Sequence, residues 1–96
     1  MPKLNDDDIN KSLEMLPGWR RERDALTKTF ELSAFVRAIA LVNEVAELAE
    51  EMDHHPDMLI EYRKVTFTLS THDAGGITEK DVALARAIEG LAKDPA

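Results

Sequence analysis

Cysteine is absent from the chain, which excludes disulfide bonds, thiolate metal sites and a cysteine nucleophile. Long apolar runs are absent as well, because no stretch approaches the ~20 apolar residues that a membrane-spanning helix needs. Residues 1–16 include three consecutive aspartates and no apolar segment of the kind that signal peptides carry. We therefore expect a cytoplasmic protein without a membrane-spanning segment.

An excess of positive charge is also missing. The chain has 12 basic and 19 acidic side chains, which give a formal net charge of -7. Nucleic-acid binding requires a basic surface that neutralises phosphates, so direct binding to DNA or RNA is not expected. The 96 residues suit a single domain, 1–96, and are too few for two independent cores. A chain this short gains stability from association with a second copy.

Apolar residues recur at helical spacing in three segments. They are predicted to be helices at about residues 6–16, at about 34–53 and after Thr78. The expected N-caps are Asn5 or Asp6, Ser33 and Thr78, the last in a capping-box pattern with Asp81. Pro56 ends the long central helix, because a proline forces the residue before it out of helical geometry.

Alternating apolar and polar residues predict two strand pairs. The first pair spans residues 19–32 with a polar turn at 22–24, and the second spans 58–71 with Arg63-Lys64 as its turn. The order is therefore helix, two strands, helix, two strands, helix. This order predicts an α+β fold of two layers, in which a four-stranded antiparallel sheet is covered by three helices on one face.

The three histidines of the chain all lie where predicted elements end. His54 and His55 precede Pro56 at the end of the central helix, and His72 follows the last strand. Element ends are where side chains converge on clefts, so this placement favours a functional role. A shared metal ion is disfavoured, because adjacent residues such as His54 and His55 point in different directions. The HExxH pattern of zinc enzymes is also absent.

Acid–base chemistry suits these residues better than metal binding. His54 is expected at a helix C-terminus, where the helix dipole favours the imidazolium form. Glu50, one turn earlier, and Asp53, alongside, are expected to act in the same direction. We therefore expect His54 to be a general acid near neutral pH.

The spacing of these residues resembles the signature of the pterin-4a-carbinolamine dehydratases. The flanking sequences MDHHP at 52–56 and KVTFTLSTHDAGGIT at 64–78 are similar to that family too, as is the earlier Gly18-Trp19. The signature positions are Glu50, His54, His55, Pro56, Tyr62, His72 and Asp81.

The resemblance implies an enzyme that dehydrates 4a-hydroxytetrahydropterin to quinonoid dihydropterin and recycles the pterin after aromatic amino-acid hydroxylation. It implies no metal and no organic cofactor, a four-stranded antiparallel sheet with helices on one face, and assembly as a homodimer or homotetramer. His54 and His72 would transfer protons at the 4a-hydroxyl and at N5. His55 would mainly hold the pterin, with or without a catalytic share.

The resemblance gives the other positions binding or structural roles. The expected substrate-binding residues are Glu50, Asp53, Pro56, Trp19 and Thr71. Glu50 or Asp53 would orient an imidazole or accept hydrogen bonds from the amino-pyrimidine edge. Trp19 would either stack on the pterin or pack in the core, and Thr71 would bond the ligand or the backbone. Asp81 is expected at the helix start as part of the capping box, and Tyr62 as a buried strand aromatic.

A second interpretation is a protein-binding module. Some members of the family act as dimerisation partners of transcription regulators and contact the protein instead of DNA. The acidic charge permits this role, although nothing in the sequence specifies a partner.

Overall fold

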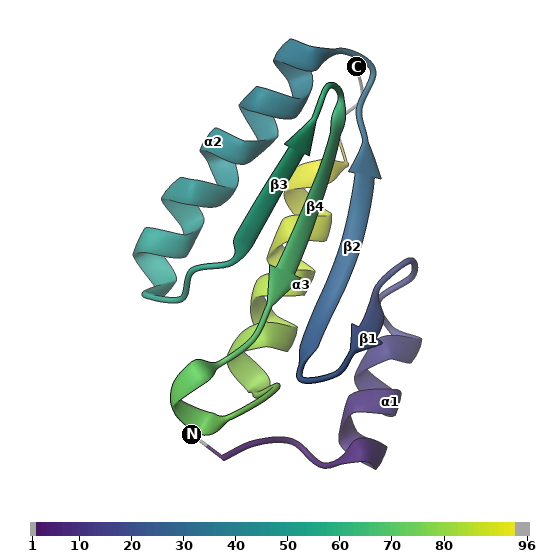
Figure 1. Cartoon of the computed structure of the whole chain (residues 1–96), viewed down its shortest axis with the longest axis vertical. Coiled ribbons are helices and arrows are strands. Elements are labelled where there is room, and N and C mark those ends of the chain that lie inside the picture. The colour runs from purple at the N-terminus through teal and green to yellow at the C-terminus, as the bar shows by residue number, and fades with distance from the viewer. Residues whose placement is uncertain (1, 94–96) are drawn as a thin grey trace.

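The structure is a computed structural model that describes residues 2–93. The predicted order of helices and strands is confirmed (Figure 1). The helices are α1 (Asp6–Glu14), α2 (Phe35–Met52) and α3 (Glu79–Ala92), with a short 3-10 turn, η1, at His72–Ala74. The strands are β1 (Arg20–Glu22), β2 (Ala25–Glu31), β3 (Asp57–Glu61) and β4 (Lys64–Leu69). No helix among residues 2–93 is long and apolar enough to cross a membrane.

The four strands form one antiparallel sheet in the order β1-β2-β4-β3. β4 lies at the centre and its alternating side chains Val65, Phe67 and Leu69 are fully buried. They face the helices, and all three helices contribute to the same apolar cluster. The buried helix side chains include Ile9 of α1, Ala38, Leu41, Val45 and Ala49 of α2, and Val82, Leu84, Ala85 and Ile88 of α3. The predicted α+β fold is therefore confirmed.

The opposite face of the sheet carries threonines that hydrogen-bond across the strands. The hydroxyls of Thr27 and Thr68 are 3.3 Å apart, and those of Thr29 and Thr66 are 2.7 Å apart. β3 is an edge strand, and every one of its side chains is exposed. The central strand β4 is therefore paired on both sides, whereas the edge strand β3 is paired on one side and its residues are exposed.

Two local predictions are wrong by one residue. The N-cap of α2 is Ala34 instead of Ser33, and it makes no side-chain cap. The reason is that the preceding Leu32 is still tied to the second hairpin, since its N–H donates to the carbonyl of Arg63 at 2.8 Å. In that hairpin Glu61 pairs with Lys64, which leaves Tyr62 and Arg63 as the turn. Tyr62 has a φ of 56° there.

Candidate active site

The end of α2 positions the first two histidines. Asp53 adopts a left-handed conformation with φ 51° and ψ 44°. Its N–H donates to the carbonyl of Glu50 at 3.2 Å, and the N–H of His54 donates to that of Ala49 at 3.0 Å. This pair of bonds is a Schellman motif, which ends a helix and reverses the chain direction. The helix therefore stops at Met52, and His54 leaves it in a new direction.

His54 is held by a buried carboxylate at the start of α3. Its Nε2 lies 2.6 Å from Oδ1 of Asp81. Asp81 is fully buried, and His54 is only 8% exposed. Asp81 also completes the predicted capping box with Thr78, which is thereby confirmed. The interpretation of Asp81 as a helix-start residue was correct but incomplete, because the same carboxylate holds His54.

Two threonines satisfy the remaining oxygen of this carboxylate. Oδ2 of Asp81 accepts hydrogen bonds from the Thr71 hydroxyl at 2.8 Å and from the Thr78 N–H at 2.9 Å. The two threonine hydroxyls are themselves 2.8 Å apart. A buried charge is tolerated only where its hydrogen-bonding capacity is met. Thr71 therefore connects the segment that carries His72 to the partner of His54.

The second ring nitrogen of His54 faces solvent. No hydrogen bond to Nδ1 is found among residues 2–93. Over the same residues, every fully buried side-chain nitrogen or oxygen has a hydrogen-bond partner. Nδ1 is therefore in contact with solvent, although the side chain as a whole is nearly buried. His54 is anchored through one nitrogen and presents the other.

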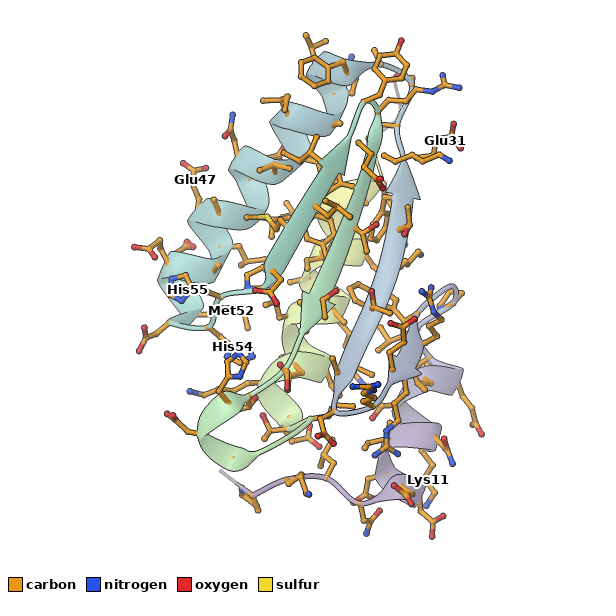
Figure 2. All side chains as sticks on the ribbon, viewed as in Figure 1. Lys11, Glu31, Glu47, Met52, His54 and His55 are labelled. Atoms are coloured by element: carbon orange, nitrogen blue, oxygen red, sulfur yellow. The ribbon has the colours of Figure 1, made fainter. Side chains whose placement is uncertain are left out.

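His55 has a different environment. Its Nε2 lies 2.5 Å from Oε2 of Glu50, and the two side chains are 56% and 76% exposed. The two imidazoles lie at the C-terminal end of α2 and point in different directions (Figure 2). The sequence predicts that Glu50 acts on His54. Instead, the Glu50 carboxylate pairs with His55, and the Asp81 carboxylate lies beside His54.

A cleft of about 310 Å³ brings the three histidines together. His72 enters it from η1, the 3-10 turn that follows β4. The residues that line the cleft are Asp53, His54, His55, Ser70, Thr71, His72, Asp73 and Lys80. Sequence reasoning missed Ser70, Asp73 and Lys80. The only signal for them was their position next to Thr71-His72 or next to Asp81.

His72 and Ser70 also line a second hollow of about 670 Å³, between the β1–β2 turn and the loop after β4. The Ser70 hydroxyl donates to the carbonyl of Asp24 at 2.6 Å, which ties this turn to the approach to His72. His72 thus stands between the histidine cleft and a wider hollow. No group of three or more His, Asp or Glu side chains suited to a metal ion is present among residues 2–93.

Five predicted binding or signature residues do not line the cleft. Two of them, Glu50 and Asp81, contact its histidines, and the other three are Trp19, Tyr62 and Pro56. Trp19 is 6% exposed, and its Nε1–H donates to Glu89 at 2.9 Å. It therefore packs in the core and does not stack over the cleft. Tyr62 is 72% exposed in the β3–β4 turn, so its assignment as a buried strand aromatic is wrong. Pro56 does not line the cleft and only directs the chain into β3.

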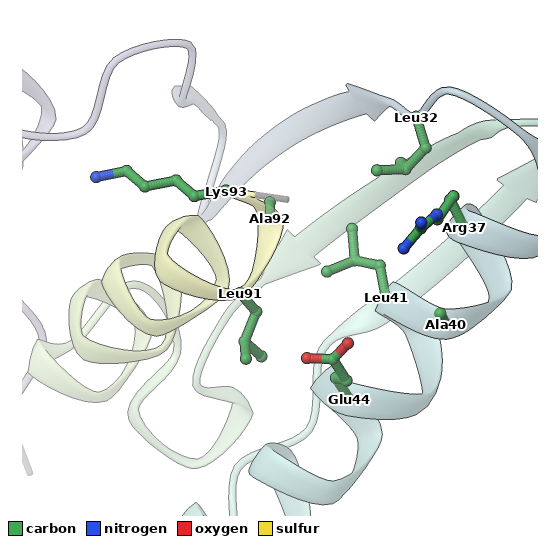
Figure 3. Close-up of a pocket in the computed structure, with 8 residues that line it drawn as sticks. All are labelled: Leu32, Arg37, Ala40, Leu41, Glu44, Leu91, Ala92 and Lys93. Atoms are coloured by element: carbon green, nitrogen blue, oxygen red, sulfur yellow. The ribbon is translucent and has the colours of Figure 1, made fainter. Parts of the chain in front are cut away.

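A further groove of about 250 Å³ lies at the other end of α2 and α3 (Figure 3). Its residues come from the first half of α2, the end of α3 and the segment after β2. They are Leu32, Arg37, Ala40, Leu41, Glu44, Leu91, Ala92 and Lys93. Five of these eight side chains are aliphatic, and none is a histidine.

Comparison with known proteins gives consistent matches over nearly the whole chain. The family model described as "Pterin 4 alpha carbinolamine dehydratase" matches residues 2–91. A protein of Thermomicrobium roseum assigned as a pterin-4-alpha-carbinolamine dehydratase is 52% identical over 92 residues, which are 96% of this chain and 99% of that protein. A protein of Mycobacteroides abscessus with the same assignment is 53% identical over 89 residues, covering 93% of this chain and 95% of its own length.

Two solved structures share the fold. The transcriptional coactivator/pterin dehydratase of Brucella melitensis superposes with a TM-score of 0.91 at 34% identity, over 94% of this chain and 98% of its own. A pterin dehydratase-like protein, described as a RuBisCO assembly factor in the alpha-carboxysome, gives a TM-score of 0.68 at 26% identity. That match covers 80% of this chain and 92% of the other.

Proposed function

Because the chain belongs to the pterin-4a-carbinolamine dehydratase family, we propose that it converts a 4a-hydroxytetrahydropterin into quinonoid dihydropterin and water. The reaction breaks the C4a–O bond, removes the proton from N5 and forms a C4a=N5 double bond. The leaving hydroxyl takes up a proton and departs as water. The reaction therefore needs one proton donor and one proton acceptor, placed on the same substrate.

His54 is the proton donor in this proposal. Its anchored Nε2–H donates to Asp81, which fixes the orientation of the ring. Nδ1 then carries the proton that is given to the 4a-hydroxyl. The Asp81 carboxylate stabilises the protonated ring through a charge-assisted hydrogen bond. The buried Thr78 and the half-buried Thr71 keep this carboxylate in place without competing for the imidazole.

His72 is the proton acceptor. No hydrogen bond to its ring is found among residues 2–93, and it lines the same cleft as His54. A neutral imidazole has one nitrogen with a free lone pair, which suits it to take the N5 proton. After the reaction His54 has lost a proton and His72 has gained one. Exchange with solvent through the open cleft restores both.

Two further cleft residues, Asp53 and His55, bind the pterin. The Asp53 carboxylate accepts hydrogen bonds from the amino-pyrimidine edge, a donor-rich edge that a carboxylate meets with two oxygens. His55, oriented by Glu50 at 2.5 Å, holds the ring at the mouth of the cleft. Thr71 is committed to Asp81 in this structure. It therefore acts on the substrate indirectly, and no metal or organic cofactor takes part.

The observation that carries the proposal is the convergence of His54 and His72 on one cleft, with Asp81 behind His54. The test is the initial rate of dehydration of freshly generated 4a-hydroxytetrahydropterin, measured against the uncatalysed reaction. His54→Ala and His72→Ala are each expected to lower kcat by about 10²–10⁴-fold. Glu44→Gln, in the groove at the other end of α2, is the matched control and should turn over like the parent protein. A parent rate equal to the uncatalysed rate would refute the proposed dehydratase activity.

Residues 1–96 form one catalytic domain in this proposal, and the domain assembles into a homo-oligomer in the cytoplasm. The open edge of β3 supports assembly, because Met58, Leu59 and Ile60 are all exposed on it. An exposed apolar edge strand readily pairs with another chain. Leu59→Lys is expected to shift the mass measured by light scattering toward the monomer. A monomeric parent protein at micromolar concentration would contradict this assembly.

The same edge favours a second candidate function, which is binding to another protein. Two proteins of similar structure are described as a transcriptional coactivator and as an assembly factor. If binding is a separate function, His72→Ala should lose turnover and keep a partner complex in native mass spectrometry, whereas Leu59→Lys should do the reverse. Loss of both properties in each variant would argue against two functions.

A further inference from the structure

The segment before α1 crosses the loop that carries His72. In Figure 1 the N-terminal end of the chain runs beside the loop between β4 and α3. The N–H of Leu4 donates to the carbonyl of Ile77 at 2.8 Å. The Leu4 side chain packs against the apolar core. Leu4 therefore holds this segment against the loop.

The side chain of Lys3 lies over Gly76 of the loop. A β-carbon built on Gly76 would lie 2.6 Å from Cδ and 3.1 Å from Cγ of Lys3. Real side chains do not approach so closely, so the Lys3 stem occupies the space that a side chain at position 76 would need. Gly76 is buried, whereas the neighbouring Gly75 is exposed. The stem of Lys3 thus contributes to covering the base of the loop.

A bridge between Thr71 and Gly76 closes the base of the loop. The N–H of Thr71 donates to the carbonyl of Gly76 at 2.9 Å, which forms an isolated bridge between these residues. Gly75 closes η1 in a left-handed conformation with φ 77°, a geometry that favours glycine. His72 lies directly after Thr71, so any shift of the bridge moves its ring.

The segment is also anchored at its other end. Asn5 caps α1 by accepting a hydrogen bond from the N–H of Asp8 at 2.8 Å. The next residue, Asp6, pairs with Arg21 of β1 at 2.7 Å. α1 itself is held to the core by Ile9. The short segment is therefore stretched between a fixed helix and the catalytic loop.

We propose that residues 2–5 are a positioning segment for His72, which acts through the Lys3 side chain over Gly76 and the Leu4 hydrogen bond to Ile77. The inference rests on the proposed role of His72 as proton acceptor. On one side the loop is held by Thr71 and Thr78 through Asp81, and on the other by Lys3 and Leu4. Proton transfer depends steeply on geometry, and a 1 Å misplacement of a reacting group costs up to roughly 10²-fold in rate.

A double-mutant cycle on Lys3 and Gly76 tests the contact. Lys3→Ala removes the stem, and Gly76→Ala adds a methyl group that displaces it. Each is expected to lower kcat by roughly threefold to tenfold with KM unchanged, because His72 moves while the binding residues stay in place. In the Lys3→Ala background, Gly76→Ala should have little further effect, because the space is already empty. Lys3→Met keeps the apolar stem and should keep the parent kcat.

A second measurement does not depend on activity. The ring resonances of His72 are expected to shift in Lys3→Ala and in Gly76→Ala, and to stay at their parent positions in Lys3→Met. Those of His55 should be unchanged in all three variants. If the parent protein shows no turnover, the proposed function fails, and these resonances still decide the positioning role. Parent-like His72 resonances and kcat in Lys3→Ala, or an equal effect of Gly76→Ala in both backgrounds, would overturn the inference.

Discussion

Two hollows at opposite ends of the α2–α3 pair differ little in volume but greatly in chemistry. The histidine cleft, of about 310 Å³, lies where the end of α2 meets the start of α3. The α2–α3 groove, of about 250 Å³, lies where the start of α2 meets the end of α3. The first collects three imidazoles and backs one of them with the buried Asp81. The second is lined by Leu32, Leu41 and Leu91 with charged side chains at its rim.

The difference shows that volume does not locate function in this protein. Both hollows lie near the ends of the same two helices, but the histidine cleft is lined mainly by the segments that follow α2 and β4, with Lys80 contributed by α3. In the histidine cleft, buried hydrogen bonds to Asp81 fix the orientation of His54, as catalysis requires. The comparison predicts that substitutions in the cleft change turnover, whereas those in the groove change stability.

Among substitutions outside the histidines, the largest effect is expected from Asp81→Asn. The substitution removes the charge beside His54 and weakens the capping box of α3. We expect kcat to fall by about 10²-fold or more, and the free energy of unfolding to fall by roughly 1–3 kcal/mol. Steady-state kinetics and urea unfolding monitored by Trp19 fluorescence measure the two effects. A kcat within twofold of the parent value would remove Asp81 from the mechanism.

A stability effect without a catalytic effect is expected from Leu41→Ala. Leu41 lines the α2–α3 groove and is 3% exposed. Truncation of a buried leucine to alanine costs about 2–5 kcal/mol through lost burial and the cavity that remains. The rate per folded molecule should stay at the parent value. A tenfold lower rate in the folded fraction would show that the groove communicates with the histidine cleft.

His55→Ala tests whether the two adjacent histidines of the cleft, His54 and His55, have different roles. His55 and Glu50 form an exposed pair, and such pairs contribute roughly 0.2–1 kcal/mol to stability. The free energy of unfolding should therefore change by less than about 1 kcal/mol. KM should rise if His55 holds the pterin as proposed, while kcat should fall far less than in His54→Ala. Equal losses of kcat in both variants would give His55 a catalytic role.

Local patterns predicted most of the fold because they follow from short-range rules. The capping box at Thr78 and the end of the central helix before Pro56 both depend on residues within one turn of chain. The core parity of Val65, Phe67 and Leu69 follows from strand alternation. The hairpin turn at Tyr62 was misplaced because the segment contains no glycine or asparagine to mark it.

Contacts over long distances could not be predicted in the same way. Helical spacing predicts that Glu50 lies beside His54. The left-handed Asp53 ends the helix before His54, so the Glu50 carboxylate contacts His55 instead. Asp81 is 27 positions from His54, and their contact exists only because the end of α2 meets the start of α3. The burial of Trp19 against α3 has the same origin.

The central claim is that the pterin occupies the histidine cleft and not the α2–α3 groove. Titration of isotope-labelled protein with a stable dihydropterin, followed by two-dimensional NMR, tests it directly. The claim predicts saturable shifts of the amide signals of His54, Thr71 and His72, and unchanged signals for Leu41 and Leu91. Shifts confined to Leu41 and Leu91, with the histidine signals unchanged, would contradict it.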